Sequence, residues 1–195
     1  MMLAYSNKEL KLDIYSLDKE RWNDFEALFG DRGACGGCWC MFWRLKKSVF
    51  DGQKGTANKN AMKNLVEQNE IVGVLGYLDG KPIGWCAVAP RDKYIRLENS
   101  RVLKRIDNEP VWSITCIFIS KPYRRKGISA ELIKGAINYC RINSASIIEA
   151  YPTVPYSNKV PEAFLWTGVP SVYAGVGFSL AEKRSKWKQI MRYYI

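Results

Sequence analysis

The stretch from Val111 to Cys140 constrains the fold of this chain more than any other part. Its beginning, Val111–Ile119, carries no charge and is rich in β-branched and aromatic residues, which predicts a buried strand. Pro122 ends that strand because it has no N–H group to give to a ladder. Apolar residues then recur at helical spacing from Ile128 to Cys140, which predicts an amphipathic helix. The stretch therefore predicts a strand, a short basic loop and a helix in direct succession.

The loop between strand and helix has the features of an anion-binding site. Gly127 lets the backbone come close to an anion because it has no Cβ. The first N–H groups of the following helix have no partner inside it, and the helix dipole adds partial positive charge there. Arg124, Arg125 and Lys126 add full charges. The loop is predicted to hold phosphates; the alternative is an ordinary solvated basic turn, since short glycine motifs recur by chance.

Two motifs also resemble those of a known family. Arg124-x-x-Gly127-x-Ser129 resembles the Arg/Gln-x-x-Gly-x-Gly/Ala signature of the GNAT superfamily of acyl-CoA-dependent N-acyltransferases, with a serine in place of the last small residue. The segment YAGVGF, which begins at Tyr173, is similar to the Tyr-x-x-x-Gly-Phe ending of the family's last helix. The resemblance covers most of the chain, including residues 84–86 and 149–152, and is to a poorly characterised bacterial branch.

The resemblance implies a fold and an activity. The fold is of the α/β class, a central mixed sheet with helices on both faces, in which the strands before and after the pyrophosphate helix splay apart around the pantetheine arm. The implied enzyme is an N-acetyltransferase that transfers an acetyl group from acetyl-CoA to a primary amine by direct attack in a ternary complex. The acceptor, a small molecule or a peptide, is left open.

The resemblance also implies which residues bind the cofactor and leaving group. The backbone of Ile117, Phe118 and Ile119 is assigned to the pantetheine amides, with an N–H near Ile117 or Phe118 facing the thioester oxygen. The pyrophosphate is assigned to the loop residues Arg124, Arg125, Lys126, Gly127, Ile128 and Ser129. Tyr173 is assigned as the general acid that protonates the leaving thiolate; the alternative is a core aromatic.

The general base is harder to assign. The chain has no histidine, which excludes Ser-His-Asp and Cys-His sites and His-x-x-x-His metal sites. The central strand has no carboxylate, so Glu149 on the neighbouring strand is the best candidate, directly or through a water. The alternative is a surface carboxylate at a strand end. Cys116 can face the slot, but an acyl-cysteine there lacks a base to activate it.

Composition leaves other classes open. The net charge is +11 and the pI about 9.4, which suits polyphosphate ligands, nucleic acid or simply a basic surface. A catalytically silent acyl-CoA sensor is the first alternative to an enzyme. A nucleic-acid-binding protein is the second, although no recognition motif supports it. A homodimer is compatible with the sequence.

The chain of 195 residues is expected to form one domain, residues 1–195. No apolar run approaches the ~20 residues of a membrane helix, and the first residues lack a signal-peptide core. A cytoplasmic protein with reduced thiols and no membrane partner is therefore expected. Cys35, Cys38 and Cys40 form the one cysteine cluster; without a fourth ligand it is not expected to hold a metal. Cys86, Cys116 and Cys140 are expected to be buried.

The aromatic segment Trp39–Leu45 is predicted to pack in the core, with a wall of the acceptor pocket as the alternative. Residues 90–110 are predicted to form a solvated loop, with a mobile flap over the acceptor as the alternative. The remaining expectations are a strand at 10–16, a helix capped by Asp18 and ending near Phe29, a loop at 30–37, a polar stretch at 50–60, a helix at 61–68, a hairpin of 71–78 and 82–89 around Asp79-Gly80, a strand at 145–151, a helix at 162–174 and a closing hairpin of 178–184 and 187–194.

Overall fold

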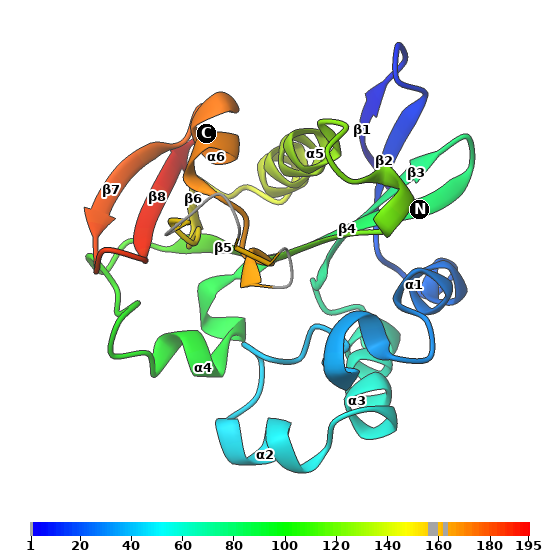
Figure 1. Cartoon of the computed structure of the whole chain (residues 1–195), viewed down its shortest axis with the longest axis horizontal. Helices are drawn as coiled ribbons and strands as arrows, with labels where there is room; N and C mark the ends of the chain where they lie inside the picture. Colours follow the sequence, from blue (N-terminus) through cyan, green and yellow to red (C-terminus); the bar gives the residue numbers. More distant parts are fainter. Residues whose placement is uncertain (1, 156–159, 162–163) are drawn as a thin grey trace.

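The computed structural model describes residues 2–155, 160–161 and 164–195. Its centre is an eight-stranded mixed sheet in the order β1-β2-β3-β4-β5-β6-β8-β7 (Figure 1). Of the described strand pairs, β5–β6 is parallel and the others are antiparallel. The strands are β1 Leu3–Asn7, β2 Leu12–Ser16, β3 Gly73–Leu78, β4 Lys81–Pro90, β5 Val111–Ile119, β6 Ile147–Ala150, β7 Ser179–Lys183 and β8 Gln189–Tyr194. The predicted α/β class with a mixed sheet is confirmed.

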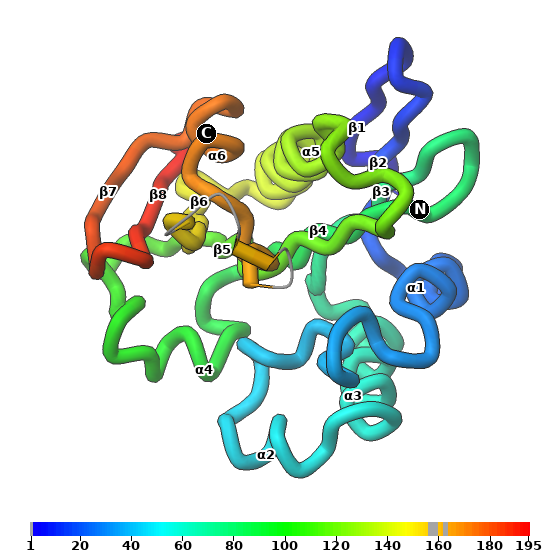
Figure 2. The backbone as a smooth tube through the Cα atoms, viewed as in Figure 1, coloured from blue at the N-terminus to red at the C-terminus, as the bar shows by residue number. Residues whose placement is uncertain are grey.

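Helices cover both faces of the sheet, as the tube in Figure 2 also shows. On one face α5 (Ile128–Ile142) buries Leu132, Ile133 and Ala136 in the same core as residues of β2, β3 and β4. On the other face α1 (Trp22–Phe29) and α3 (Thr56–Glu67) pack with the buried ring of Trp85 in a second core. The short helices are α2 Lys47–Gly52, α4 Ile95–Glu98 and α6 Pro170–Gly175. No helix in the described part of the chain is long and apolar enough to cross a membrane.

Local signals explain where most elements begin and end. Asp79 and Gly80 have φ angles of 47° and 75°, as a type I′ turn requires, and join β3 to β4 as predicted. Asp18 caps the turn before α1 rather than the helix, because its Oδ1 accepts the Arg21 N–H at 3.1 Å and α1 begins at Trp22. The helix predicted at 162–174 starts at residues 162–163, which lie outside the described residues; in the described part it corresponds to α6, which begins at Pro170 because proline suits the first helical turn.

One expectation was wrong, one strand was missed, and one helix begins earlier than predicted. The polar stretch at 50–60 contains the end of α2 and the start of α3, so the helix predicted at 61–68 begins at Thr56. The strand β1 was not predicted; Ala4 is buried in the core under α5 and the Tyr5 hydroxyl donates to Glu131 of α5 at 2.7 Å. The segment 90–110 is not a solvated loop, because it includes α4 and buries four residues beside β4 and β8 at no more than 3% exposure: Arg91, Tyr94, Leu97 and Leu103.

The β5–β6 ladder is short and ends inside the sheet. It runs from Val111↔Ile147 to Ile114↔Ala150, whereas β5 continues to Ile119. On its other side β5 stays paired with β4 up to Ile119. The second half of β5 therefore has one edge that β6 does not cover, next to the start of α5.

Candidate functional site

A pocket of about 810 Å³ opens along the uncovered edge of β5. One end is formed by the loop before α5 and the start of that helix, and the other by the segment 34–54. A third side is formed by residues 165–172, which precede and begin α6. The lining residues are Phe29, Ala34, Cys35, Gly36, Cys38, Cys40, Phe42, Trp43, Phe50, Lys54, Cys116, Ile117, Phe118, Ile119, Arg124, Arg125, Ser129, Pro155, Val160, Leu165, Trp166, Gly168, Val169 and Val172.

The loop before α5 has the backbone shape of an anion cradle. Arg125 and Gly127 both have positive φ angles, 58° and 77°, and such turns point successive N–H groups to one side. No side chain caps α5, and the N–H groups of Ile128 and Ser129 have no hydrogen-bond partner among the described residues. A Cβ built on Gly127 meets nothing within 4 Å, so the space in front of the loop is open. This end of the pocket fits a phosphate or pyrophosphate group.

Not every residue assigned to the pyrophosphate faces the pocket with its side chain. Arg124, Arg125 and Ser129 line it, whereas Ile128 is buried at 5% exposure in the core under α5. Arg124 Nε also donates to the Ile119 carbonyl at 2.8 Å, which fixes the loop to the end of β5. Ile128 and Gly127 can therefore act through the backbone, and the two arginines through charge.

The open edge of β5 carries one of the predicted donors. Ile117 N–H points away from β4 and donates to the Trp166 carbonyl at 2.7 Å. Backbone groups alternate along a strand, so Ile119 faces the same edge and Phe118 faces β4. Of the two candidates for the thioester N–H, Ile117 thus has the accessible orientation, although its present partner is a carbonyl of the protein.

Tyr173 lies one layer behind the pocket wall. Its side chain is fully buried and its hydroxyl donates to the Thr167 carbonyl at 3.1 Å. A Cβ built on Gly168, which lines the pocket, meets the Tyr173 ring at 2.7 Å, so only this glycine lets the ring stand so close to the wall. Burial raises the pKa of Tyr173 well above the ordinary tyrosine value, which keeps the hydroxyl protonated.

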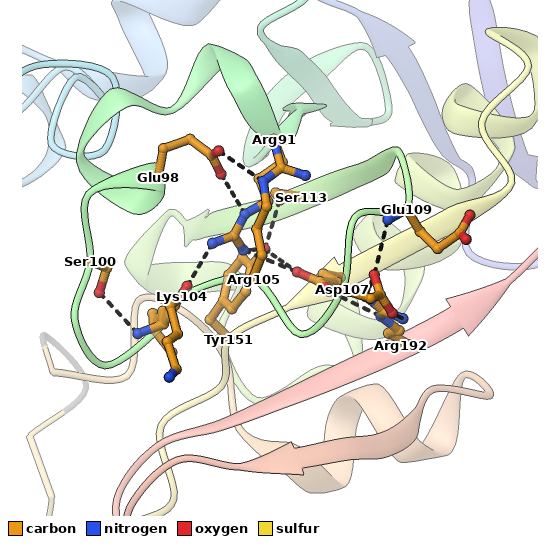
Figure 3. Close-up of polar contacts among 12 residues, drawn as sticks. Arg91, Glu98, Ser100, Lys104, Arg105, Asp107, Glu109, Ser113, Tyr151 and Arg192 are labelled. Atoms are coloured by element: carbon orange, nitrogen blue, oxygen red, sulfur yellow. Dashed lines mark hydrogen bonds and ion pairs between the residues drawn. The ribbon is translucent and has the colours of Figure 1, made fainter.

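Glu149 is not part of the pocket lining that the structure describes. It is 1% exposed and bound by two arginines: Arg91 Nη1 lies 3.1 Å from Oε2, and Arg192 Nη2 lies 2.8 Å from Oε1. The Tyr151 hydroxyl also donates to Oε2 at 2.7 Å. Figure 3 shows Arg91 next to Tyr151, and Arg192 next to Asp107, whose Oδ2 lies 2.6 Å from Arg192 Nη1. The alternative of a surface carboxylate is wrong, and a carboxylate held this way is poorly placed to take a proton from an acceptor.

Four of the six cysteines line the pocket: Cys35, Cys38, Cys40 and Cys116. Trp85 Nε1 donates to the Cys40 sulfur at 3.2 Å. A hydrogen bond from the Cys116 thiol lowers the pKa of Cys40, whereas burial raises the pKa of Cys38 to about 11. Among the described residues no group of three or more His, Cys, Asp or Glu side chains is arranged to hold a metal ion.

In the aromatic segment Trp39–Leu45, some residues pack in the core and others line the pocket. Trp39 and Met41 are buried at 3% exposure in the core beside Trp85. Phe42 and Trp43 are partly exposed and line the pocket. They meet a ring from a distant part of the chain, Trp166, whose centroid lies 5.2 Å from that of Phe42 and 6.0 Å from that of Trp43. Sequence reasoning missed Trp166, because a lone tryptophan between two turns carries no periodic signal.

Comparisons with known proteins identify the family and the fold of the chain. The sequence profile of the Acetyltransferase (GNAT) family matches residues 39–163. Among solved structures, a GNAT-family acetyltransferase from Listeria monocytogenes superposes with a TM-score of 0.58 at 13% identity, covering 98% of this chain and 99% of that one. The PaiA N-acetyltransferase of Thermoplasma acidophilum, solved in complex with coenzyme A, gives 0.53 at 14% identity over 94% and 99%.

A third structure, the ribosomal-protein-S5-alanine acetyltransferase of Vibrio fischeri, gives a TM-score of 0.54 at 12% identity over 94% of this chain and 93% of that one. No relative among the curated proteins matches the chain. At identities of 12–14% these structures show the fold alone. The profile match spans more than half of the chain and shows the family. This chain belongs to the GNAT family of acetyltransferases.

Proposed function

We propose that the protein is an N-acetyltransferase that uses acetyl-CoA and a primary amine. The observation that carries the proposal is the continuity of one pocket: the phosphate-sized cradle at the start of α5 opens directly onto the uncovered edge of β5. A cofactor with phosphates at one end and an amide-containing arm fits that arrangement. The PaiA structure with coenzyme A, on the same fold, supports the same donor.

The proposed reaction is direct attack in a ternary complex. The acceptor nitrogen forms a bond to the thioester carbonyl carbon, and the negative charge that develops on the oxygen is stabilised by the Ile117 N–H. The C–S bond then breaks, and the departing coenzyme A sulfur takes a proton from the Tyr173 hydroxyl, which regains a proton from water after the thiol has left. The attacking nitrogen loses its extra proton to water. Orienting both substrates in one pocket converts a bimolecular encounter into a nearly unimolecular step.

Both donors in this scheme are held by one short segment. The Trp166 carbonyl accepts the Ile117 N–H, and the adjacent Thr167 carbonyl accepts the Tyr173 hydroxyl. Thr153 N–H in turn donates to the Gly168 carbonyl at 3.0 Å and anchors the segment. Since each donor has one proton to give, the cofactor must take the place of these two carbonyls. The proposed reaction therefore requires the backbone of Trp166 and Thr167 to shift when acetyl-CoA binds.

Replacement of Gly127 tests the proposal. Gly127→Glu introduces a carboxylate into the open space in front of the cradle, where it repels phosphate, and coenzyme A binding should be lost in calorimetry. Gly127→Ala is the matched control, since it adds only the cost of a positive φ, about 1 kcal/mol, to the loop. Unchanged coenzyme A affinity in a folded Gly127→Glu protein would exclude the site. Tight binding without turnover of any amine would instead indicate a catalytically silent sensor.

A further inference from the structure

The cysteines of the pocket have no role in the proposed function. Two of the four that line it come from distant parts of the chain: Cys40 precedes α2, and Cys116 lies in β5 directly before Ile117. Both belong to the core around Trp85, Cys40 as a buried member and Cys116 packed against it. Because the Cys116 thiol donates a hydrogen bond to the Cys40 sulfur, the two sulfurs are in contact in the pocket wall.

The contacts of Cys40 favour its thiolate form. Besides the Cys116 thiol, the indole N–H of the fully buried Trp85 donates to the Cys40 sulfur at 3.2 Å. The buried guanidinium of Arg44 adds positive charge nearby. The hydrogen bond from Cys116, that from Trp85 and the charge of Arg44 together lower the pKa of Cys40, although burial opposes them. The thiolate is the form of cysteine that reacts with oxidants.

Cys116 is held in the complementary form. The same hydrogen bond raises the pKa of Cys116 well above the ordinary cysteine value, and burial adds to the increase. Of the two thiols, Cys40 is therefore the one that ionises first, and Cys116 is the one that keeps its proton. Disulfide formation under oxidants needs two such partners in contact, one sulfur that is oxidised first and a second that then attacks it.

The other cysteines have different surroundings. Cys38 donates to the Gly33 carbonyl, with 3.5 Å between sulfur and oxygen, and burial raises the pKa of its thiol to about 11. Cys35 is an exposed residue of the pocket lining. The two remaining cysteines are buried and do not belong to the lining that the structure describes. These differences distinguish Cys40 and Cys116 from the neighbouring thiols.

The backbone at Cys40 is strained. Trp39 and Cys40 have φ angles of 42° and 59°, in the left-handed region that is unfavourable for any residue with a Cβ. The buried Trp39 ring stabilises this turn, because it stacks on the Phe29 ring with centroids 5.7 Å apart. Strained residues persist only where the surrounding structure holds them, and they cluster at functional sites. The strain therefore supports a role for Cys40 beyond packing.

We propose that Cys40 and Cys116 form an oxidation site, at which a hydroperoxide converts the two thiols into a disulfide in the pocket wall. The Cys40 thiolate attacks a peroxide oxygen, the O–O bond breaks, and a sulfenic acid and a hydroxide ion result. The Cys116 sulfur then attacks the Cys40 sulfur, the S–O bond breaks, and the oxygen leaves as water with the proton of the Cys116 thiol. The two thiols lose two electrons in total, and the peroxide gains them. This modification goes beyond the proposed function, since it requires neither coenzyme A nor an acceptor.

Peptide mapping of the wild-type protein tests the proposal without a variant. The reduced protein is treated with hydrogen peroxide at neutral pH, the remaining thiols are alkylated, and the proteolytic peptides are identified by mass. The expected main product is a pair of peptides linked through Cys40 and Cys116, lighter by two hydrogens than the free pair, which a dithiol reductant separates again. Free thiols at both positions after the treatment, or a main product that links either residue to another cysteine, would overturn the proposal.

Two variants separate the roles of the two sulfurs. Cys116→Ser keeps a hydroxyl donor beside Cys40 but removes the attacking thiol, so the Cys40 sulfenic acid should persist and be captured by a 1,3-dione reagent. Cys40→Ser should slow the reaction of Cys116 with peroxide by about tenfold or more relative to that of Cys40, because Cys116 keeps its proton. Equal rates of capture at the two sulfurs would contradict the order proposed. Cys35→Ser is the matched control, an exposed thiol of the same lining, and should form the disulfide at the wild-type rate.

Acetyl-CoA separates this inference from the proposed function. Both sulfurs line the pocket assigned to the cofactor, so saturating acetyl-CoA, which has no free thiol, should slow disulfide formation in the wild-type protein. In Gly127→Glu the disulfide should form equally fast with and without acetyl-CoA. A wild-type disulfide that forms at the same rate in both conditions would contradict the cofactor site and leave the oxidation site standing. Absence of the disulfide from a protein that binds acetyl-CoA would overturn the oxidation site and leave the proposed function standing.

Discussion

Along its first half β5 is paired with β6, and buried arginines and carboxylates pair beside that ladder; along its second half the ladder is gone and a pocket opens along the uncovered edge. Beside the paired half Arg91 and Arg192 both bind Glu149, and each has a second carboxylate, Glu98 or Asp107. Beside the open half the pocket lining carries cations and no described carboxylate. The first half is closed by its own contacts, and the second borders the pocket to which coenzyme A is assigned in the proposed function.

Among the described residues, the buried carboxylate Glu149 lies beside the paired half of β5. A buried charge is stable only if paired and hydrogen-bonded, and the network around Glu149 supplies both. Tyr151 joins it to Ser113 of β5, whose Oγ lies 2.8 Å from the Tyr151 oxygen. In the paired half, arginine side chains thus stabilise the fold; in the open half, the proposed function assigns Arg124 and Arg125 to binding the cofactor.

Of the substitutions considered, removal of Glu149 should lower the free energy of unfolding the most. Glu149→Leu leaves the Arg91 and Arg192 guanidinium groups facing each other without their shared counter-charge, and one side of a broken buried pair costs about 3–5 kcal/mol. The free energy of unfolding, measured in urea, should fall by about that amount. Glu67→Leu is the control, since Glu67 is an exposed carboxylate on α3. A loss equal to that of the control would show that the network does not stabilise the fold.

The more conservative variant Glu149→Gln distinguishes a stabilising role of Glu149 from a catalytic one. If Glu149 were the general base, turnover would fall by about 10²-fold or more, and its dependence on pH would change. If it holds β6 against β4 and β8, stability falls and the turnover of the folded protein stays close to wild type. The comparison of the two halves predicts the second result.

Tyr173→Phe probes the open half with a smaller effect. The substitution keeps the buried ring against Phe178, whose centroid is 5.2 Å away, and deletes the oxygen that donates to Thr167. Turnover should fall by about 10²-fold, the lower end of the range for one positioned acid, because the hydroxyl must first leave the Thr167 carbonyl. Acetyl-CoA affinity should change little. Tyr139→Phe, a buried tyrosine on α5 outside the pocket lining, is the control. Wild-type turnover in Tyr173→Phe would mean that water protonates the thiolate.

The sequence predicted the parts of this comparison that depend on neighbours in the chain. The β5–loop–α5 unit was read from contiguous residues, because an uncharged strand, Gly127 and a helical apolar stripe are local signals. The Asp79-Gly80 turn is local in the same way. The proposed phosphate site rests on the same local signals.

The parts that were missed depend on contacts between distant residues. Arg91 and Glu149 are 58 positions apart, and nothing near either residue indicates that they pair. Trp166 meets Ile117 and Phe42 only because the chain folds back between β6 and α6. The segment 90–110 was predicted as solvated from its many charges, yet its apolar residues are what anchor it. Composition shows which charges a segment carries but not which of them find partners.

The smallest expected effect is the loss of the Arg192–Asp107 contribution to stability in acid. A pair of hydrogen bonds from Arg192 lowers the pKa of Asp107, with Nη1 2.6 Å from Oδ2 and Nη2 2.9 Å from Oδ1. Since the pKa is lower in the folded state, the unfolded chain binds more protons as the pH falls, so this contribution is present above the ordinary aspartate pKa of about 3.9 and is lost on acidification through the folded value. Asp107 is 37% exposed, so solvent screens the pair and its contribution should stay within about 1 kcal/mol.

Unfolding free energies of wild type and Asp107→Asn should differ at neutral pH and converge in acid, and 1 M salt should reduce the difference between them. Glu109→Gln, an exposed carboxylate two residues away, is the control; a difference that persists unchanged into acid would contradict the assignment.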